Sequence, residues 1–248
     1  IQESLEPSQP NLETGPYGVE LTDKMILDLA RNNIEQSKRM GFVQGDPAAI
    51  LIVEYAGDTE QEVKAKVADP EARRGRGAFG YASHIATDGA EQQSIWKLRK
   101  AGLGLLLGTR GESKPIAFIE DTAVDPKHLP EFVPRFTEIM ARHGADAAYY
   151  GQCSVGCLHI RPLINLKTER GLEQVRVMAE EIFDLVLSFG GAISSEHGDG
   201  RARSPFLERV FGKTLFQAFR ETKAAFDPRG LMNPGNIVGS PGVTEHLR

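Results

Sequence analysis

The chain has 248 residues, of which 40% are hydrophobic and 25% are charged, and its formal net charge is −5 at pH 7. This length and composition predict a globular protein with a full hydrophobic core, built as one large domain or two subdomains. The acidic balance gives no support for nucleic-acid binding, and no apolar run approaches the roughly 20 residues that span a bilayer. Without a secretory signal, we expect a cytoplasmic location.

Hydrophobic periodicity switches repeatedly between the helical and the strand pattern along the chain. Residues 1–17 are polar and Pro-rich and predict a loose lead-in, and Thr22 or Asp23 is suited to cap the first helix. In chain order, we expect a helix over 21–32, a strand over 48–55, a helix over 59–67, a strand over 79–86, a helix over 92–107, a strand over 116–124, a helix over 129–143, paired strands over 147–151 and 158–165, a helix over 172–189, two shorter helices and a turn-rich segment over 227–235.

Helices and strands alternate in this list, and two consecutive strands form a hairpin. The pattern predicts an α+β fold, in which an antiparallel sheet has helices packed mainly on one face. A β-helix-β unit occurs twice, which is compatible with a ferredoxin-like duplication. The segment 75–80 matches G-x-G-x-x-G but lacks a preceding strand and a following helix, so we interpret it as a surface loop rather than a nucleotide site.

Two short segments carry the chemistry. The first is Ser194–Gly200, where Glu196 and His197 stand next to each other between a Gly-Gly turn and a second glycine-rich turn. The second is Gly156-Cys157-Leu158-His159, in which strand alternation points His159 and Arg161 to one face and Leu158 to the other. A Glu and two His side chains bind a divalent metal or move a proton at neutral pH, so we expect a catalytic site where the segments meet.

The remaining candidates are weaker by composition alone. Cys153 and Cys157 are the two cysteines of the chain, are too few for a disulfide framework, and are not spaced as C-x-x-C. We interpret them as loop-packing residues, one of which is able to flank a metal. Arg99 lies on a helix and by composition is a packed surface arginine. The 233–235 Asn-Pro-Gly segment is a turn by composition.

Taken together, several motifs resemble the C-terminal domain of FAD-linked oxidases of the vanillyl-alcohol oxidase type. This group includes D-lactate dehydrogenase, D-2-hydroxyglutarate dehydrogenase and the glycolate oxidase flavin subunit. The wording of the motifs is most similar to large bacterial members that also carry an iron–sulfur domain. The motifs are W-K-L-R at 96–99, E-D-T-A-V at 120–124, G-C-L-H at 156–159, the segment 191–198 and D-P-R-G-L-M-N-P-G at 227–235.

The resemblance implies roles for individual residues. The family's metal-binding pattern, H-x-G-D-G-N-L-H followed by the Glu of a later E-H-G, places metal ligands at His159 and Glu196. Its first His falls on Gln152, whose carbonyl is a weaker ligand than imidazole, and its Asn falls on Cys157. The resemblance thus implies a divalent metal, Zn, Mn or Fe, with a weaker set of ligands than in the family. The resemblance also makes His197 the active-site base. Its substrate-carboxylate arginine maps onto Arg99 and its flavin-facing asparagine onto Asn233.

The resemblance also implies a domain organisation. Residues 18–238 would form the substrate, or cap, domain, residues 239–248 a tail, and the FAD-binding domain would lie outside this chain. The partners would then be that FAD domain, a small 2-hydroxy acid and an electron acceptor that the sequence does not identify. The implied function is oxidation of a D-2-hydroxy acid by FAD in a larger cytoplasmic protein. That protein would have its iron–sulfur cluster elsewhere and peripheral contact with the inner membrane as an option.

Two other functions remain open at this level. The chain would be a non-catalytic module that binds a metal or a carboxylate, if no flavin domain accompanies it. It would be a metal-dependent hydrolase, if Glu196 acts as a base and His159 as a metal ligand.

Overall fold

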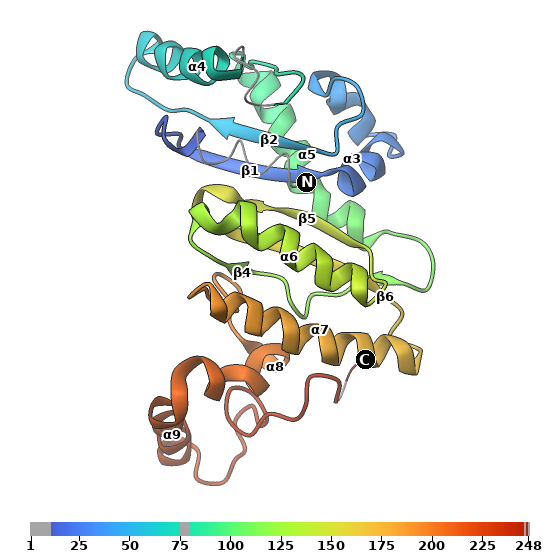
Figure 1. Ribbon diagram of the computed structural model, residues 1–248, viewed down its shortest axis with the longest axis vertical. Helices are drawn as coiled ribbons and strands as arrows, with labels where there is room; N and C mark the ends of the chain where they lie inside the picture. The colour runs from blue at the N-terminus through green and yellow to red at the C-terminus, as the bar shows by residue number, and fades with distance from the viewer. Residues whose placement is uncertain (1–10, 75–79, 246, 248) are drawn as a thin grey trace.

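The computed structural model describes residues 11–74, 80–245 and 247 of the chain. An antiparallel sheet runs through the middle of the molecule in the order β2-β1-β5-β6-β3, and the short strand β4 also pairs with β6 (Figure 1). The strands are β1 (Gly18–Asp23), β2 (Ala49–Glu54), β3 (Lys114–Pro115), β4 (Thr122–Ala123), β5 (Ala147–Gln152) and β6 (Cys157–Ile164).

Helices lie above, below and beside this sheet, from α4 at one end of the molecule to α9 at the other (Figure 1). They are α3 (Lys24–Arg31), α4 (Glu60–Arg74), α5 (Gly89–Leu107), α6 (Leu129–Arg142), α7 (Glu169–Ser188), α8 (Gly200–Arg203) and α9 (Leu207–Phe226), with short 3-10 turns η1 (Gln36–Phe42), η2 (Pro126–His128), η3 (Cys153–Val155) and η4 (Ser204–Phe206). The expected antiparallel α+β class is confirmed.

The two faces of the β5–β6 hairpin have different neighbours. Leu158 and Ile160 are fully buried in the main core with the aromatic side chains of α6 and α7, such as Phe136 and Phe183. On the opposite face, Ala148 and Tyr150 of β5 form a smaller cluster with residues of α3 and α5. Tyr150 pairs with His159 across the hairpin, so His159 stands on this second face. The predicted alternation along β6 is confirmed.

Most of the longer predicted elements are confirmed, with shifts at their ends. The strand expected over 48–55 is β2, the helices expected over 59–67, 92–107, 129–143 and 172–189 are α4 to α7, and the paired strands are β5 and β6. The two helices expected after 189 are the four-residue α8 and the longer α9, which is broken at Gly212 where φ is +76°.

The prediction of one helix over 21–32 was wrong for its first residues. Gly18–Asp23 is strand β1, because Val19 and Leu21 alternate into the main core while β2 and β5 pair with its two edges. The helix α3 begins only at Lys24. Asp23 is its cap, as expected, since its carboxylate accepts a hydrogen bond from the N–H of Ile26.

Two predicted strands were wrong or much shorter. Within 116–124 only Thr122–Ala123 pairs as a strand, because Asp121 takes a left-handed backbone conformation with φ of +70°. The segment after Gly191 contributes a single bridge, between Ala192 and Ala123. Residues 80–86 are irregular, while Phe79 lies outside the described residues. Most of the G-x-G-x-x-G segment and residues 1–10 of the lead-in also lie outside them.

Candidate active site

His159 stands at the centre of a polar cluster on the second face of the sheet. It is 7% exposed, and its Nε2 lies 3.8 Å from Oε2 of Glu196. Burial lowers the pKa of His159 because it penalises the charged imidazolium, so the ring is neutral at pH 7. Within the described part of the chain, its Nδ1 is buried without a hydrogen-bond partner. A neutral, buried imidazole is the form of histidine that ligates metals.

Asp121 fixes the loop that carries Glu196 and His197. Its carboxylate accepts hydrogen bonds from the N–H groups of Ser195 (3.0 Å), Glu196 (2.9 Å) and His197 (2.8 Å), and from the hydroxyls of Ser194 and Ser195 at 3.0 Å each. Burial by itself would raise the pKa of Asp121. These donors outweigh it and hold the pKa well below its ordinary value, so Asp121 is a permanent anion.

Glu120, the neighbour of Asp121, supports His197 directly. Its Oε1 lies 3.2 Å from Nδ1 of His197, and the carboxylate is only 4% exposed. Arg161 of β6 balances its charge, since an Nη of Arg161 donates to Oε1 at 2.9 Å and its Nε also contacts the carboxylate. The ring of His197 stacks on that of His159, with centroids 5.2 Å apart and planes within 7°. Both histidines therefore face one small volume.

Arg203 of α8 anchors the loop that carries Glu196 and His197. It is 5% exposed, and its guanidinium donates to the carbonyl oxygens of Ile193 (2.9 Å), Gly198 (3.1 Å) and Glu120. Charge-assisted bonds of this kind are stronger than neutral ones and fix geometry. The backbone on both sides of Glu196 and His197 is thus anchored.

Two glycines allow the backbones of the site to approach closely. Gly156, just before β6, has φ of +72°, and a Cβ there would lie 1.7 Å from the carbonyl oxygen of Val124. Gly191 lies against Ala123, where a Cβ would come within 2.4 Å of the carbonyl oxygen. Only glycine fits such contacts.

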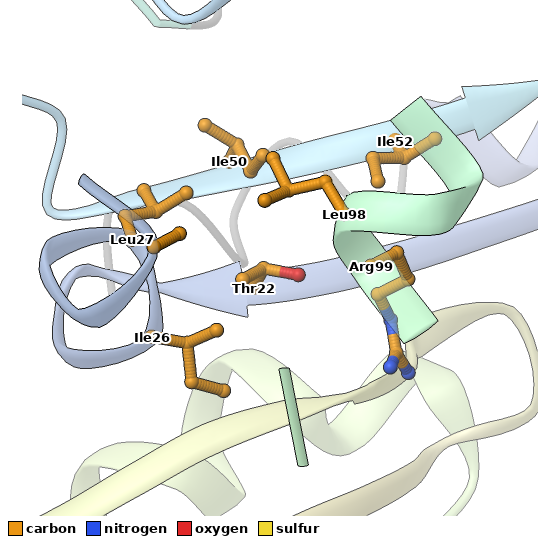
Figure 2. Close-up of a pocket in the computed structure, with 8 residues that line it drawn as sticks. Thr22, Ile26, Leu27, Ile50, Ile52, Leu98 and Arg99 are labelled. Carbon is orange, nitrogen blue, oxygen red and sulfur yellow. The ribbon is translucent and has the colours of Figure 1, made fainter. Parts of the chain in front are cut away.

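Arg99 lies one aromatic ring away from the histidine cluster. Its guanidinium sits 5.2 Å from the centroid of the Tyr150 ring, which in turn lies 5.1 Å from that of His159. Its Nε and an Nη donate to one carboxylate oxygen of Glu20, at 3.0 and 2.6 Å. Figure 2 shows the stem of Arg99 beside a small, mainly apolar pocket between strands β1 and β2 and helices α3 and α5, with its charged end pointing away from the pocket.

Gln152 ends β5 beside the same cluster. It pairs in register with Cys157 on β6 and with Glu20 on β1, so it belongs to the row of residues on the face that carries Tyr150 and His159. Cys153 and Cys157 are free and buried. Cys157 lies within the cluster, since its Sγ is 2.9 Å from Oγ of Ser195 and 3.5 Å from Oδ1 of Asp121.

Asn233 is exposed in the turn that follows α9, with φ of +45°. Asp227 organises this turn by accepting from Lys223 and from the N–H groups of Leu231 and Met232. The segment after the turn lies beside η4, because the N–H of Ile237 donates to Oγ of Ser204 at 2.7 Å. The side chain of Asn233 bonds within this segment, since its Oδ1 accepts from Nδ2 of Asn236 at 2.6 Å.

Two groups of side chains offer ligand atoms that all lie within 4.8 Å of one another. One is Asp121, His159 and His197, and the other is Cys157, His159 and Glu196. In the first group the Asp121 oxygens are already saturated by the loop and His197 contacts Glu120. In the second, Glu196 is 44% exposed, and its ion-pair partner among the described residues is His159. The residues present therefore fit a divalent metal at His159 and Glu196.

Sequence reasoning brought His159, Glu196 and His197 together correctly but missed the residues that hold them. In the sequence, Glu120 and Asp121 stand out only as part of the E-D-T-A-V motif, and Arg203 does not stand out. Arg161 was placed on the face of His159 without a partner. The sequence offers one signal for Glu120 and Asp121. These two adjacent carboxylates stand directly before a short β-branched run, a position where a solvent-exposed loop would not need them.

Comparison with known proteins gives the family. The model of the family described as FAD linked oxidases, C-terminal domain, matches residues 11–237. The chain belongs to this family. The motif resemblance is thereby confirmed, and the family implies FAD as the cofactor. Among the described helices, none has the length and apolarity to cross a membrane.

Several curated relatives carry the name D-2-hydroxyglutarate dehydrogenase. The protein of Pantoea ananatis is 32% identical over 237 residues, which cover 91% of this chain and 23% of the relative. That of Escherichia coli is 30% identical and covers 94% and 24%. A D-lactate dehydrogenase of Archaeoglobus fulgidus is 27% identical and covers 90% and 46%. The chain thus spans about a quarter of the length of the first two relatives.

Solved structures share the fold. A 4-ethylphenol oxidase from Gulosibacter chungangensis superposes with a TM-score of 0.58 at 13% identity, over 94% of this chain and 50% of that one. A p-cresol methylhydroxylase gives 0.58 at 16% identity, over 96% and 49%. At these identities the likeness concerns the fold alone.

Proposed function

We propose that this chain is the substrate-binding domain of an FAD-dependent dehydrogenase that oxidises a D-2-hydroxy acid of the lactate, 2-hydroxyglutarate or glycolate class to the 2-oxo acid. The observation that carries the proposal is the convergence of His159, Glu196 and His197, held by Glu120 and Asp121, in a member of this family. Family membership favours this function over a carboxylate-binding module or a metal-dependent hydrolase.

His197 is the base in this proposal. Its Nδ1 faces the Glu120 carboxylate, so the Nδ1–H tautomer is favoured and Nε2 is left with a lone pair for the proton of the substrate hydroxyl. Arg161 holds Glu120 in place through their ion pair. The arrangement is that of an imidazole oriented by a buried carboxylate, which is a frequent design of proton-accepting histidines.

His159 and Glu196, with Gln152 beside them, would hold the divalent metal, for which Zn, Mn and Fe are the candidates. Burial keeps His159 neutral and thus ready to donate its lone pair, and the partly exposed Glu196 adds a negative charge. Such an ion would polarise the 2-hydroxyl oxygen of the substrate. The carbonyl of Gln152 is a weaker donor than imidazole, so these three residues alone form a weak site.

Arg99 is the proposed partner of the substrate carboxylate. It already holds a carboxylate, that of Glu20, through two of its nitrogens, and it lies next to the Tyr150 ring that contacts His159. A bound 2-hydroxy acid would share or replace the Glu20 contact, with its hydroxyl directed toward His197. Guanidinium groups bind carboxylates with defined geometry, which would orient the substrate.

FAD would be held mainly by a domain outside this chain, with Asn233 of the exposed turn beside the flavin. When bound, FAD supplies the redox chemistry by accepting hydride from the hydroxyl-bearing carbon. We assign residues 18–238 to the substrate domain and 239–248 to a tail. An iron–sulfur cluster would lie elsewhere in the full-length protein, because the two cysteines here are too few for the usual four thiolate ligands.

The direct test is anaerobic reduction of FAD in the full-length protein. D-2-hydroxyglutarate, D-lactate or glycolate should bleach the flavin absorbance, and the L enantiomers of the first two should do so much more slowly. Bleaching by none of the three acids would overturn the proposal. Hydrolysis of simple esters by the protein, stimulated by added metal, would favour the hydrolase instead.

A further inference from the structure

Cys157 occupies a place in the cluster that a loop-packing residue does not require. It begins β6 two residues before His159, so both side chains stand on the same face of the strand. Its Sγ, a nitrogen of His159 and a carboxylate oxygen of Glu196 all lie within 4.8 Å of one another. The sulfur thus lies next to the two residues proposed above as metal ligands.

We infer that Cys157 is a metal ligand in this protein and that it compensates for the weak donor Gln152, which makes the site selective for thiolate-preferring ions such as Zn²⁺. The inference rests on the proposed metal site of the preceding subsection. It adds a ligand of a different chemical type, because a thiolate prefers Zn²⁺ whereas a carbonyl oxygen suits Mg²⁺ or Mn²⁺.

The geometry is close to that of a bound site. In tetrahedral zinc sites with bonds of about 2.0–2.3 Å, neighbouring ligand atoms lie on the order of 3.3–3.8 Å apart. Nε2 of His159 and Oε2 of Glu196 are already 3.8 Å apart. Glu196 is 44% exposed and is a terminal carboxylate on a flexible stem, so rotation of its side chain can adjust its position relative to an ion.

The competing set of ligands is less suitable. Asp121 is the carboxylate that the first group offers, but it accepts three backbone N–H groups and two hydroxyls from the 194–197 loop. Withdrawal of Asp121 toward an ion would leave these donors unsatisfied. Cys157 does not hold the backbone of the loop in this way, since its two polar contacts are with the side chains of Ser195 and Asp121.

Binding would release a proton. A thiol bonds to a divalent ion as the thiolate, so the S–H bond of Cys157 has to break. A divalent ion that bonds to Sγ displaces this proton to the buffer. The hydroxyl of Ser195, 2.9 Å from Sγ, can then donate to the thiolate and stabilise it.

The two cysteines of the chain provide a matched pair of variants. Cys153 is also buried but belongs to the main core and to neither group of ligands. Co²⁺ added to the 248-residue chain should produce a near-ultraviolet thiolate-to-metal band in the wild type and in Cys153→Ala, and no such band in Cys157→Ala. Zn²⁺ affinity should fall roughly 100-fold or more in Cys157→Ala and remain near the wild-type value in Cys153→Ala.

A measurement on the wild type guards against a variant that fails to fold. X-ray absorption of the Zn²⁺-loaded chain should show one sulfur at about 2.3 Å in the first shell. A shell of nitrogen and oxygen alone, a thiolate band that persists in Cys157→Ala, or no binding of Co²⁺ or Zn²⁺ at all would overturn the inference. Flavin reduction by a hydroxy acid is unaffected by these outcomes, so the two proposals fail separately.

Discussion

The imidazole rings of His159 and His197 lie parallel to within 7° with their centroids 5.2 Å apart, although one comes from strand β6 and the other from a loop 38 positions later. The stack places one neutral, buried ring beside one that is 44% exposed. The two residues therefore differ in environment in a way that suits a metal ligand and a base.

Glu120 should matter for turnover more than for substrate binding. Glu120→Gln removes the negative charge beside Nδ1 of His197 and leaves Arg161 unpaired, so in the full-length enzyme we expect kcat to fall by about 10²-fold with a smaller change in KM. Steady-state kinetics with the best hydroxy acid measures both.

Glu181→Gln is the matched control for this change. Glu181 also lies between an arginine and a histidine, Arg142 and His143, but on the helices that cover the opposite face of the sheet. It should leave kcat near the wild-type value. Equal losses in the two variants would contradict the role given to Glu120.

Asp121 should be essential for the folded conformation of the 194–197 loop. Asp121→Asn presents an amide NH₂ to backbone N–H donors, so we expect a loss of about 2–4 kcal/mol in the free energy of unfolding. Denaturant unfolding of the chain measures this loss. The exposed Asp184, which pairs with Arg209 at the surface, is a control, and Asp184→Asn should cost less than about 1 kcal/mol. A similarly small loss of unfolding free energy in both variants would contradict this role of Asp121.

Gly156 should tolerate no side chain. Gly156 and Gly190 have similar positive φ angles, +72° and +66°. A Cβ at Gly156 would collide with the carbonyl oxygen of Val124, whereas a Cβ at Gly190 would meet open space. We expect Gly190→Ala to cost about 1–2 kcal/mol, from the backbone conformation alone, and Gly156→Ala to cost clearly more. Thermal unfolding of the two variants checks the order, and equal melting temperatures would be inconsistent with the close approach.

Asp23 should make stability depend on pH. Burial outweighs its two backbone hydrogen bonds and raises its pKa to about 6, from 3.8. Between these values the folded state binds more protons than the unfolded state, so the free energy of unfolding contributed by Asp23 falls as pH rises from about 4 to 6, by on the order of 3 kcal/mol, and is constant above that. Denaturant unfolding of wild type and Asp23→Asn across this range should show a difference in free energy between the two that falls as pH rises. Parallel pH profiles would refute the prediction.

The sequence predicts the fold and the site correctly where they depend on local patterns, and it does not where they depend on contacts between distant segments. The alternation of Leu158, His159 and Ile160 predicted correctly which face of β6 carries the chemistry, because strand geometry enforces it. The segment before Ala123 is rich in β-branched and aromatic residues and predicted a long strand. The backbone turns instead at Asp121, which bonds to a loop more than 70 positions away. Local periodicity contains no trace of such a contact.

His197 accepts the proton of the substrate hydroxyl in the proposed reaction, and turnover of His197→Ala in the full-length, FAD-loaded enzyme tests this role. The control is His84→Ala, at a surface histidine that pairs with Glu91. We predict that kcat falls by at least about 10²-fold for His197→Ala and changes by less than about twofold for His84→Ala. Turnover of His197→Ala that stays within about tenfold of the wild type would contradict this role of His197.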